Sequence, residues 1–306
     1  MNAAQPRPSV ATLKVMSWNI HGGVGPDGAF DLDRIAALIA RHKPDIFALQ
    51  EIDTRGRDVA CLAPLEGLGI GHFTEARTIL APDGHYGHAL FSRWPTRGVE
   101  LHDLSVRRRE PRIAIEAEVL TPAGPLHVVA VHVGLAILER RRQVMTLAAM
   151  ARRRRPLPTL MMGDFNDWFS FGLVTRTLTR VLPERTELRS FPARWPVMRL
   201  DRIYGSHEGM IARAWTDPQG RFASDHLPVI AEIRLPPGAA VWEPAGEGDV
   251  APDWWQTGGS VHGAATDSRQ PVSPADPAGR SARCPADAGT NPDSRADPRP
   301  GAPAGA

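Results

Sequence analysis

Short apolar runs separated by turn-forming residues make up much of the chain as far as about residue 236. Pro-Asp-Gly at 82–84 and Thr-Pro-Ala-Gly at 121–124 are two of the intervening turn signals. Runs of this length with such boundaries are typical of β-strands. The predicted strands are 13–20, 45–50, 73–80, 88–92, 98–104, 113–119, 126–132, 159–162, 198–204, 210–215 and 229–233.

Other segments repeat their apolar residues with the period of an α-helix. Leu32, Ile35 and Ile39, for example, fall on one face of a helix. The segment 57–71 is punctuated by Gly and Pro, and we expect a loop there. The predicted helices are 31–42, 136–154 and 168–181.

Strands outnumber helices in this pattern, and short turns join several neighbouring strands. Such connections favour antiparallel or mixed sheets over a purely parallel wound sheet. The sequence therefore predicts an α/β (α+β) fold. We expect a four-layer α/β/β/α sandwich, in which two mixed, mainly antiparallel sheets carry helices on their outer faces.

Composition divides the chain into three parts. Pro, Gly, Ala, Ser, Asp and Arg dominate residues 237–306, and aliphatic residues are scarce there. A segment of this kind buries too little apolar surface to offset its loss of entropy on ordering. We therefore expect a flexible N-terminus at 1–12, a folded domain at 13–236 and a disordered tail at 237–306.

The net charge of the chain is +2, and basic residues occur in runs. The runs are Arg107–Arg109, Arg140–Arg142 and Arg152–Arg155. They would suit an anionic partner such as nucleic acid or an anionic membrane surface. Solvated faces of an Arg-rich chain are the alternative interpretation, and no aromatic residues interleave with these runs to stack on bases.

Only Cys61 and Cys284 are present, and their separation fits neither a disulfide framework nor a metal site. No apolar run reaches the roughly 18 residues needed to span a bilayer, and the first residues lack a signal-peptide core. We expect a monomeric cytoplasmic protein without a transmembrane segment.

Polar residues of catalytic type follow several of the apolar runs. Each such residue alone is weak evidence, because polar groups are normal at the rim of a sheet, but loops at strand ends are also where a scaffold presents reactive groups. The residues concerned are Asn19, Gln50, Glu51, His132, Asp164, Asn166, Asp201, Asp225 and His226.

This collection consists of carboxylates, amides and imidazoles, without a thiol ligand or a GxSxG motif. Carboxylate and amide oxygens suit a hard cation, Mg²⁺ or Mn²⁺, more than zinc. A hard cation beside carboxylates and imidazoles is suited to hydrolysis of phosphoesters, since the metal neutralises phosphate charge while a side chain prepares water.

The same stretches resemble the endonuclease/exonuclease/phosphatase superfamily, whose members include deoxyribonucleases, sphingomyelinases and inositol polyphosphate phosphatases. Gly-Asp-Phe-Asn followed later by Ser-Asp-His is the most specific pair of motifs. The resemblance covers about residues 13–234 and implies the four-layer sandwich. The matching stretches are Ser17–Ile20, Leu49–Glu51, Tyr86–Arg93, Val131–Val133, Gly163–Asn166, Leu200–Ile203 and Ser224–Pro228.

The resemblance also implies roles around a metal and a water. Glu51 would be the principal metal ligand, assisted by Asn19. Asp225 would complete the metal shell or lie just outside it. Asp164 would orient or deprotonate the attacking water, and Asn166 would hold the phosphate.

Imidazoles complete the implied site. His226 would contact the phosphate or act as a general base, and Asp201 would fix its tautomer and orientation. His132 would donate to a phosphate oxygen or stabilise the transition state, although a histidine at a sheet edge is often only structural. Asp167 is predicted to cap the helix that follows it.

Three further residues are predicted to contact substrate. Arg112 resembles a phosphate-facing arginine of the family, with a surface salt bridge as the alternative. Tyr86 and His88 belong to the Tyr-Gly-x-Ala stretch. His88 departs from the family pattern, which commonly has Asn there.

The sequence predicts a phosphodiesterase but leaves its substrate open. Basic runs favour a DNA or RNA nuclease, and phosphate contacts by arginine would make its binding salt-dependent. Resemblance to a bacterial subgroup favours a lipid or small-molecule phosphoester. A non-catalytic binding protein on the same fold is a third alternative, against which the complete acid, amide and imidazole set argues.

Overall fold

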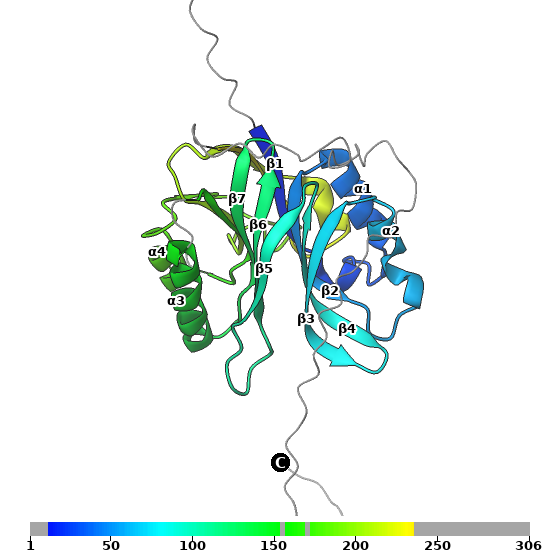
Figure 1. Ribbon diagram of the computed structural model, residues 1–306. Helices are drawn as coiled ribbons and strands as arrows, with labels where there is room; N and C mark the ends of the chain where they lie inside the picture. The colour runs from blue at the N-terminus through cyan, green and yellow to red at the C-terminus, as the bar shows by residue number, and fades with distance from the viewer. Residues whose placement is uncertain (1–11, 154–156, 169–171, 236–306) are drawn as a thin grey trace, which may run out of the picture. The chain divides into compact units, whose positions relative to one another are not determined.

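The computed structural model describes residues 12–153, 157–168 and 172–235 (Figure 1). The domain predicted at 13–236 lies almost wholly within these residues. The predictions for the N-terminus and for the tail at 237–306 fall outside them, except that Thr12 already belongs to the first strand.

Two six-stranded sheets form the centre of the described chain. Each sheet contains one parallel pair, β1 with β2 and β7 with β8, and its other pairs are antiparallel. The first sheet has the order β11 (Ile211–Thr216), β12 (Val229–Arg234), β1 (Thr12–Asn19), β2 (Ile46–Asp53), β4 (Gly84–Ser92), β3 (His72–Ala81). The second has the order β5 (Thr96–Asp103), β6 (Ile113–Thr121), β7 (Gly124–His132), β8 (Thr159–Asp164), β10 (Asp201–Gly205), β9 (Glu184–Arg185).

Helices connect these strands. The side chain of Asp31 accepts the Arg34 N–H at the start of α1, and Lys43 ends that helix in the left-handed conformation. None of the described helices is long and apolar enough to cross a membrane. The helices are α1 (Leu32–His42), α2 (Ala63–Glu66), α3 (Ile137–Arg153), α4 (Leu173–Leu178) and the short 3₁₀ helices η1 (His21–Gly23), η2 (Val59–Leu62) and η3 (Pro218–Phe222).

Three apolar cores separate four layers. Val15 and Ala48 of the first sheet pack with Val128 of the second in the central core. The second core lies between the first sheet and α1 and α2, and the third between the second sheet and α3 and α4. The predicted four-layer sandwich is therefore confirmed (Figure 1).

Two local predictions were wrong. The segment predicted as a loop at 57–71 contains η2 and α2. The helix predicted at 168–181 is reduced to α4, whose N-cap is Gly172. Asp167 is not the N-cap residue, but its carboxylate accepts the Thr175 N–H at 3.0 Å and so caps the helix from outside.

Candidate active site

The strand pairing brings the predicted polar residues to one end of the sandwich. Asn19 lies opposite Gln50 in the parallel pair of the first sheet. In the second sheet, Asp164 lies between His132 on β7 and Asp201 on β10. Parallel neighbours end at the same edge of a sheet, and the antiparallel strand β10 begins at that edge, so the strand register brings these side chains together.

Glu51 reaches the site because β2 contains a bulge. The pairing with β4 shifts between Gln50 and Ile52, which leaves Glu51 as the extra residue, and its φ is 60°. A bulge of this kind redirects a side chain out of the regular alternation, and a left-handed Glu is strained backbone. The strain is maintained at the position where the sequence predicts the principal metal ligand.

Asn19 bridges the two sheets. Its Nδ2 donates to Glu51 Oε1 at 2.8 Å and to Asp164 Oδ2 at 3.1 Å. Its Oδ1 accepts the N–H of His21 at 3.0 Å, which fixes the orientation of the amide. In this orientation Asn19 holds the two carboxylates in place, and its oxygen faces the backbone.

The turn after β8 positions Asp164 and Asn166 of the Gly-Asp-Phe-Asn motif. Gly163 has a φ of 153°, and a Cβ there would lie 1.9 Å from the carbonyl oxygen of Val131, so only glycine fits. Asp164 Oδ1 accepts the Asn166 N–H at 2.9 Å, and Asn166 Nδ2 donates to Val133 O at 2.8 Å. The turn is therefore held by its own polar side chains, and both are buried.

His226 is held from several sides. Its Nδ1 donates to Asp201 Oδ2 at 2.7 Å, and its backbone carbonyl accepts the Trp18 Nε1–H at 2.9 Å across a sequence separation of 208 residues. The Phe191 ring packs on the imidazole at 4.7 Å between centroids. These contacts direct Nε2 toward Asp164, whose Oδ2 is 4.0 Å away.

Burial and neighbouring charges shift the two reacting candidates in the same direction for different reasons. Burial, followed by the charge of Asp201, raises the pKa of Asp164 to about 7. Burial lowers the pKa of His226, but the charge and hydrogen bond of Asp201 outweigh it and raise this pKa to about 10. At neutral pH His226 therefore favours the imidazolium form, and Asp164 is a weaker acid than an ordinary aspartic acid.

The pKa of Glu51 is shifted in the opposite direction to those of Asp164 and His226. Burial alone would raise its pKa, but the neighbouring His21 imidazole and the hydrogen bond from Asn19 outweigh burial and lower it to about 2. The carboxylate is therefore ionised throughout the physiological range. His132 Nε2 lies 3.7 Å from Glu51 Oε1 and 3.8 Å from Asp164 Oδ2, which places this predicted residue inside the site.

The three residues predicted to contact substrate are partly or fully buried next to these site residues. His88 and Arg112 are buried, and Tyr86 is partly buried. Arg112 pairs with Glu110 and hydrogen-bonds Tyr86. The pKa of His132 is lowered mainly by burial and, to a lesser extent, by the charge of Arg112. Burial lowers the pKa of His88 to about 4.

His21 belongs to the site although the sequence analysis missed it. Its Nδ1 lies 3.7 Å from Glu51 Oε2 and 3.5 Å from Asp225 Oδ1. It follows the end of β1 by two residues and adopts a φ of 49°, so the strand-end pattern does not include it. The only feature of the sequence that could have indicated His21 is its position two residues after Asn19.

The donor set fits a divalent cation of the hard class. Glu51 offers an ionised carboxylate, and Asp225 Oδ1 is buried without a hydrogen bond among the described residues. His21 Nδ1 stands between these two carboxylates, where positive charge is stabilised. Oxygen donors without a thiolate suit Mg²⁺ or Mn²⁺.

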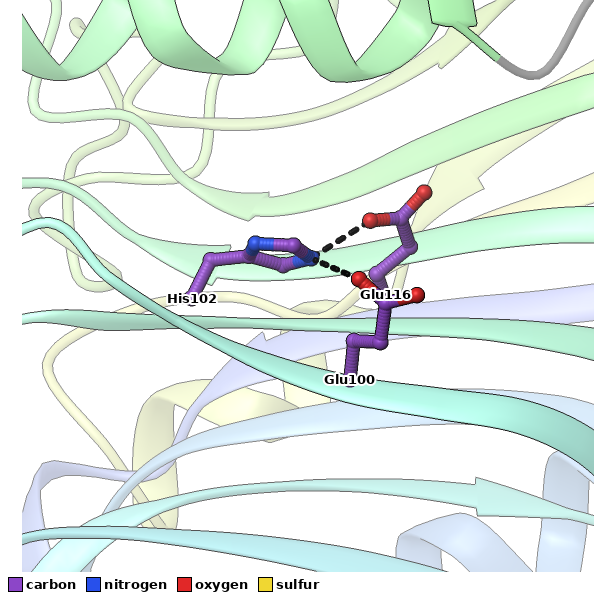
Figure 2. A group of neighbouring side chains, drawn as sticks. All are labelled: Glu100, His102 and Glu116. Carbon is purple, nitrogen blue, oxygen red and sulfur yellow. Dashed lines mark ion pairs between the residues drawn. The ribbon is translucent and has the colours of Figure 1, made fainter.

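A second acidic group with a histidine lies elsewhere on the second sheet (Figure 2). Glu100 and His102 come from β5, and the buried Glu116 comes from β6. Figure 2 shows the His102 ring pointing at both carboxylates, 2.5 Å from Glu116 Oε2 and 3.4 Å from Glu100 Oε2. Arg153 forms ion pairs with the same two oxygens, Glu100 Oε2 and Glu116 Oε2. This group is therefore an ion-pair network that attaches the end of α3 to the sheet.

Similar proteins share this arrangement of the chain. The chain is 30% identical over 250 residues to the uncharacterized protein YbhP of Escherichia coli strain K12, covering 73% of this chain and 97% of YbhP. An endonuclease/exonuclease/phosphatase structure from Beutenbergia cavernae is 22% identical, with a TM-score of 0.61 over 76% of this chain and 73% of that one. TDP2 from Caenorhabditis elegans is 18% identical, with a TM-score of 0.56 over 73% and 75%.

The family comparison covers the whole site. Residues 16–226 match the Endonuclease/Exonuclease/phosphatase family, and this segment runs from the end of β1 to His226. It includes each carboxylate, amide and imidazole described above. The resemblance noted in the sequence is therefore confirmed, and the chain belongs to the endonuclease/exonuclease/phosphatase family.

Proposed function

We propose that the protein is a metal-dependent phosphoesterase that hydrolyses a phosphodiester by attack of water. The observation that carries this proposal is the placement of the Asp164 carboxyl group and the His226 imidazole, which face each other across 4.0 Å. Members of the family are generally hydrolases of phosphoester bonds, which gives the reaction class. The chemistry of these two groups gives the mechanism.

In this proposal Asp164 receives the proton of the attacking water. A pKa raised to about 7 by burial and by Asp201 makes it a base matched to neutral pH. Asn19 and the Asn166 N–H each bind one of its oxygens and fix the direction of the carboxylate. Asn166 also lines the site, where it is proposed to position the phosphate.

His226 is proposed to donate from Nε2 to a phosphate oxygen. With its pKa raised to about 10, it is an imidazolium before the reaction begins, so it stabilises developing negative charge instead of removing a proton. The hydrogen bond from Nδ1 to Asp201 keeps Nε2 directed at the site. His132 is proposed to add a second nitrogen donor on the side of Glu51.

Glu51 and Asp225 are proposed to hold a Mg²⁺ or Mn²⁺ ion, with Asn19 orienting Glu51. When bound, the ion would neutralise phosphate charge and support the leaving oxygen. Arg112 is proposed to act through Tyr86 and His132 at the rear of the site. Tyr86 and His88 are proposed to shape the phosphate pocket from the same direction.

The direct test uses the full chain and bis-p-nitrophenyl phosphate. We expect hydrolysis with Mg²⁺ or Mn²⁺ and its loss in EDTA, with recovery when the metal is restored. Hydrolysis that persists in EDTA after dialysis would contradict the metal-dependent mechanism. A protein that binds the metal but never turns over would favour a non-catalytic role on this fold.

Nuclease and lipid or small-molecule phosphodiesterase activities share this mechanism, and a substrate panel separates them. Single-stranded DNA, RNA, phospholipids and inositol phosphates are the informative members. A cytoplasmic location and a monomeric state stay predictions from the sequence.

A further inference from the structure

Large apolar side chains are exposed around the mouth of the candidate active site. Leu135 is 62% exposed and follows His132 by three residues. Trp168 is 52% exposed and follows Asn166 by two. A chain advances at most about 3.6 Å per residue, so both lie within roughly 11 Å, Cα to Cα, of a site residue.

Exposed apolar side chains also occur on two other segments near the site. Trp195 is 73% exposed and lies two residues after Ala193, whose N–H donates to the carbonyl of Asp225 at 2.6 Å. Val197 is exposed in the same loop. Leu80, 74% exposed, lies near the tip of the β3–β4 hairpin, which extends past the bulge that presents Glu51.

A basic loop lies at the same end. The loop between β5 and β6 projects beside the β3–β4 hairpin in Figure 1. Arg107, Arg108 and Arg109 are all exposed in it, in a tight turn closed by the bond from Arg109 N–H to Val106 O. Glu110 in the same loop is already paired with Arg112. The loop therefore presents net positive charge.

We propose that this end of the molecule docks on an anionic phospholipid bilayer. The docking rim consists of Leu80, Leu135, Trp168, Trp195 and Val197 with Arg107–Arg109. The inference rests on the proposed function, because it gives the phosphoesterase site a surface on which its substrate would be held. Bilayer docking places the site mouth at the level of the phosphate headgroups.

The composition of the rim selects this partner over the alternatives. Tryptophan is the side chain that favours the interface between headgroups and acyl chains, and arginine is attracted to anionic headgroups. Leu80, Leu135 and Val197 suit hydrocarbon, and they have no ring face on which a base could stack. A second copy of the same rim would bring two arginine clusters together, which opposes self-association.

Co-sedimentation of the full chain with vesicles tests the proposal. We expect strong binding to phosphatidylcholine vesicles that contain phosphatidylglycerol, at least about tenfold above vesicles of phosphatidylcholine alone, and weakening as salt is added. Replacing Arg107, Arg108 and Arg109 together with Gln should lower the partition coefficient about a hundredfold, since each arginine near the surface contributes about fivefold.

Trp195→Ser tests the apolar part, and Phe73→Ser is its matched control. Phe73 is also largely exposed but lies at the other end of β3, opposite Phe91. Trp195→Ser should weaken vesicle binding about tenfold or more, and Phe73→Ser should leave it within twofold. Equal losses in the two variants would overturn the proposal, as would equal binding to neutral and anionic vesicles.

Two further outcomes would also overturn the docking proposal. One is tight binding of single-stranded DNA that depends on the arginines but not on Trp195. The other is a dimer, detected by light scattering, that Trp195→Ser converts to a monomer. Leu135→Ser supplies a second apolar variant where Trp195→Ser does not fold.

A vesicle-free assay keeps the two proposals separable. The rim variants should hydrolyse bis-p-nitrophenyl phosphate within about twofold of the wild-type protein, because none of the replaced side chains belongs to the proposed catalytic set. Vesicle binding without any hydrolysis would refute the proposed function and leave docking standing. Hydrolysis without preference for anionic vesicles would do the reverse.

Discussion

The protein contains two groups of acidic and imidazole side chains that have the same composition. Asp164, Asp201 and His226 lie at the candidate active site, and Glu100, His102 and Glu116 lie away from it on β5 and β6 (Figure 2). Each has two carboxylates and one imidazole within a few ångströms of one another. They differ in what surrounds them.

Around Glu116 the charge is already balanced. Oε1 faces His127 at 2.9 Å, while Oε2 faces His102 at 2.5 Å and Arg153 at 2.6 Å. The guanidinium also reaches Glu100 at 3.4 Å. An arginine that pairs with both carboxylates makes the outer group an ion-pair network.

Around Asp164 the charge is left partly unbalanced. His226 supplies one positive partner, and no Arg or Lys ion pair is recorded for Asp164 or Asp201 among the described residues. Asp201 Oδ1 is buried without a hydrogen bond there. The comparison teaches that the partners of an acidic cluster, more than its composition, separate a reactive site from a structural one.

The largest expected difference between the two groups is in turnover. His226→Ala and Asp164→Asn should each lower kcat by about 10³-fold or more, because each removes a group proposed to act on the reacting atoms. The matched change His102→Ala should leave kcat within about twofold. Steady-state hydrolysis of bis-p-nitrophenyl phosphate measures this, with circular dichroism as the check of folding.

If His102→Ala were as damaging as His226→Ala in a folded protein, the two groups would not be functionally distinct. Wild-type activity in His226→Ala would remove the proposed donor role of His226. Either result would require a new assignment of the site.

The second expected effect is on stability, and it falls on the outer group. Glu116→Gln removes the buried charge that His127, His102 and Arg153 surround, and should lower the free energy of unfolding by about 3 kcal/mol. Asp201→Asn should cost less stability but at least about 10²-fold in kcat. Urea titration and the hydrolysis assay on the same samples would show whether Glu116→Gln mainly lowers the free energy of unfolding and Asp201→Asn mainly lowers kcat. Equal losses of stability and of kcat in the two variants would argue against this difference.

The pH dependence of stability sharpens the contrast further. The folded pKa of His226 is raised from 6.5 to about 10, so its contribution is fully present below pH 6.5 and is lost as pH rises through about 10. The free energy of unfolding should fall over this window by at most about 1.4 kcal/mol per pH unit. His226→Gln should flatten this part of the curve, as followed by urea titration from pH 6 to 10. An unchanged slope in the variant would contradict the assigned shift.

The smallest effect distinguishes the groups by metal binding. At a Mg²⁺ or Mn²⁺ concentration ten times the Kd, a single native site adds about 1.4 kcal/mol of stability. For a domain of this size that corresponds to a rise in Tm of a few degrees. Glu51→Gln should abolish the rise and Glu100→Gln should keep it in differential scanning fluorimetry. The opposite result would place the metal at the outer group.

Periodicity and strand-end chemistry were sufficient to predict much of this structure. Leu32, Ile35 and Ile39 predict α1, and that helix is present with its cap at Asp31. Among the residues predicted at the strand ends, Asp164 and His132 lie together because the strand register aligns them. Features that depend on neighbouring residues in the sequence could therefore be predicted.

Features that depend on contacts formed only in the folded chain could not be predicted from the sequence. Asp167 was predicted to cap the helix and its carboxylate does so, but the start of α4 after Gly172, five residues later, was not predicted. His21 enters the site only because Glu51 and Asp225, far away in sequence, surround it. The bulge at Glu51 arises from pairing with β4, which the alternation of β2 alone does not reveal.

The bond from Trp18 to the carbonyl of His226 has a consequence for synthesis of the protein. It joins the first strand to a residue 208 positions later, and Asp164 and Asp201 are placed in between. A ribosome adding roughly 5–20 residues per second needs on the order of tens of seconds to cover that separation. Until residue 226 has emerged, the nascent chain lacks the imidazolium, and a truncated product ending before it would be catalytically silent.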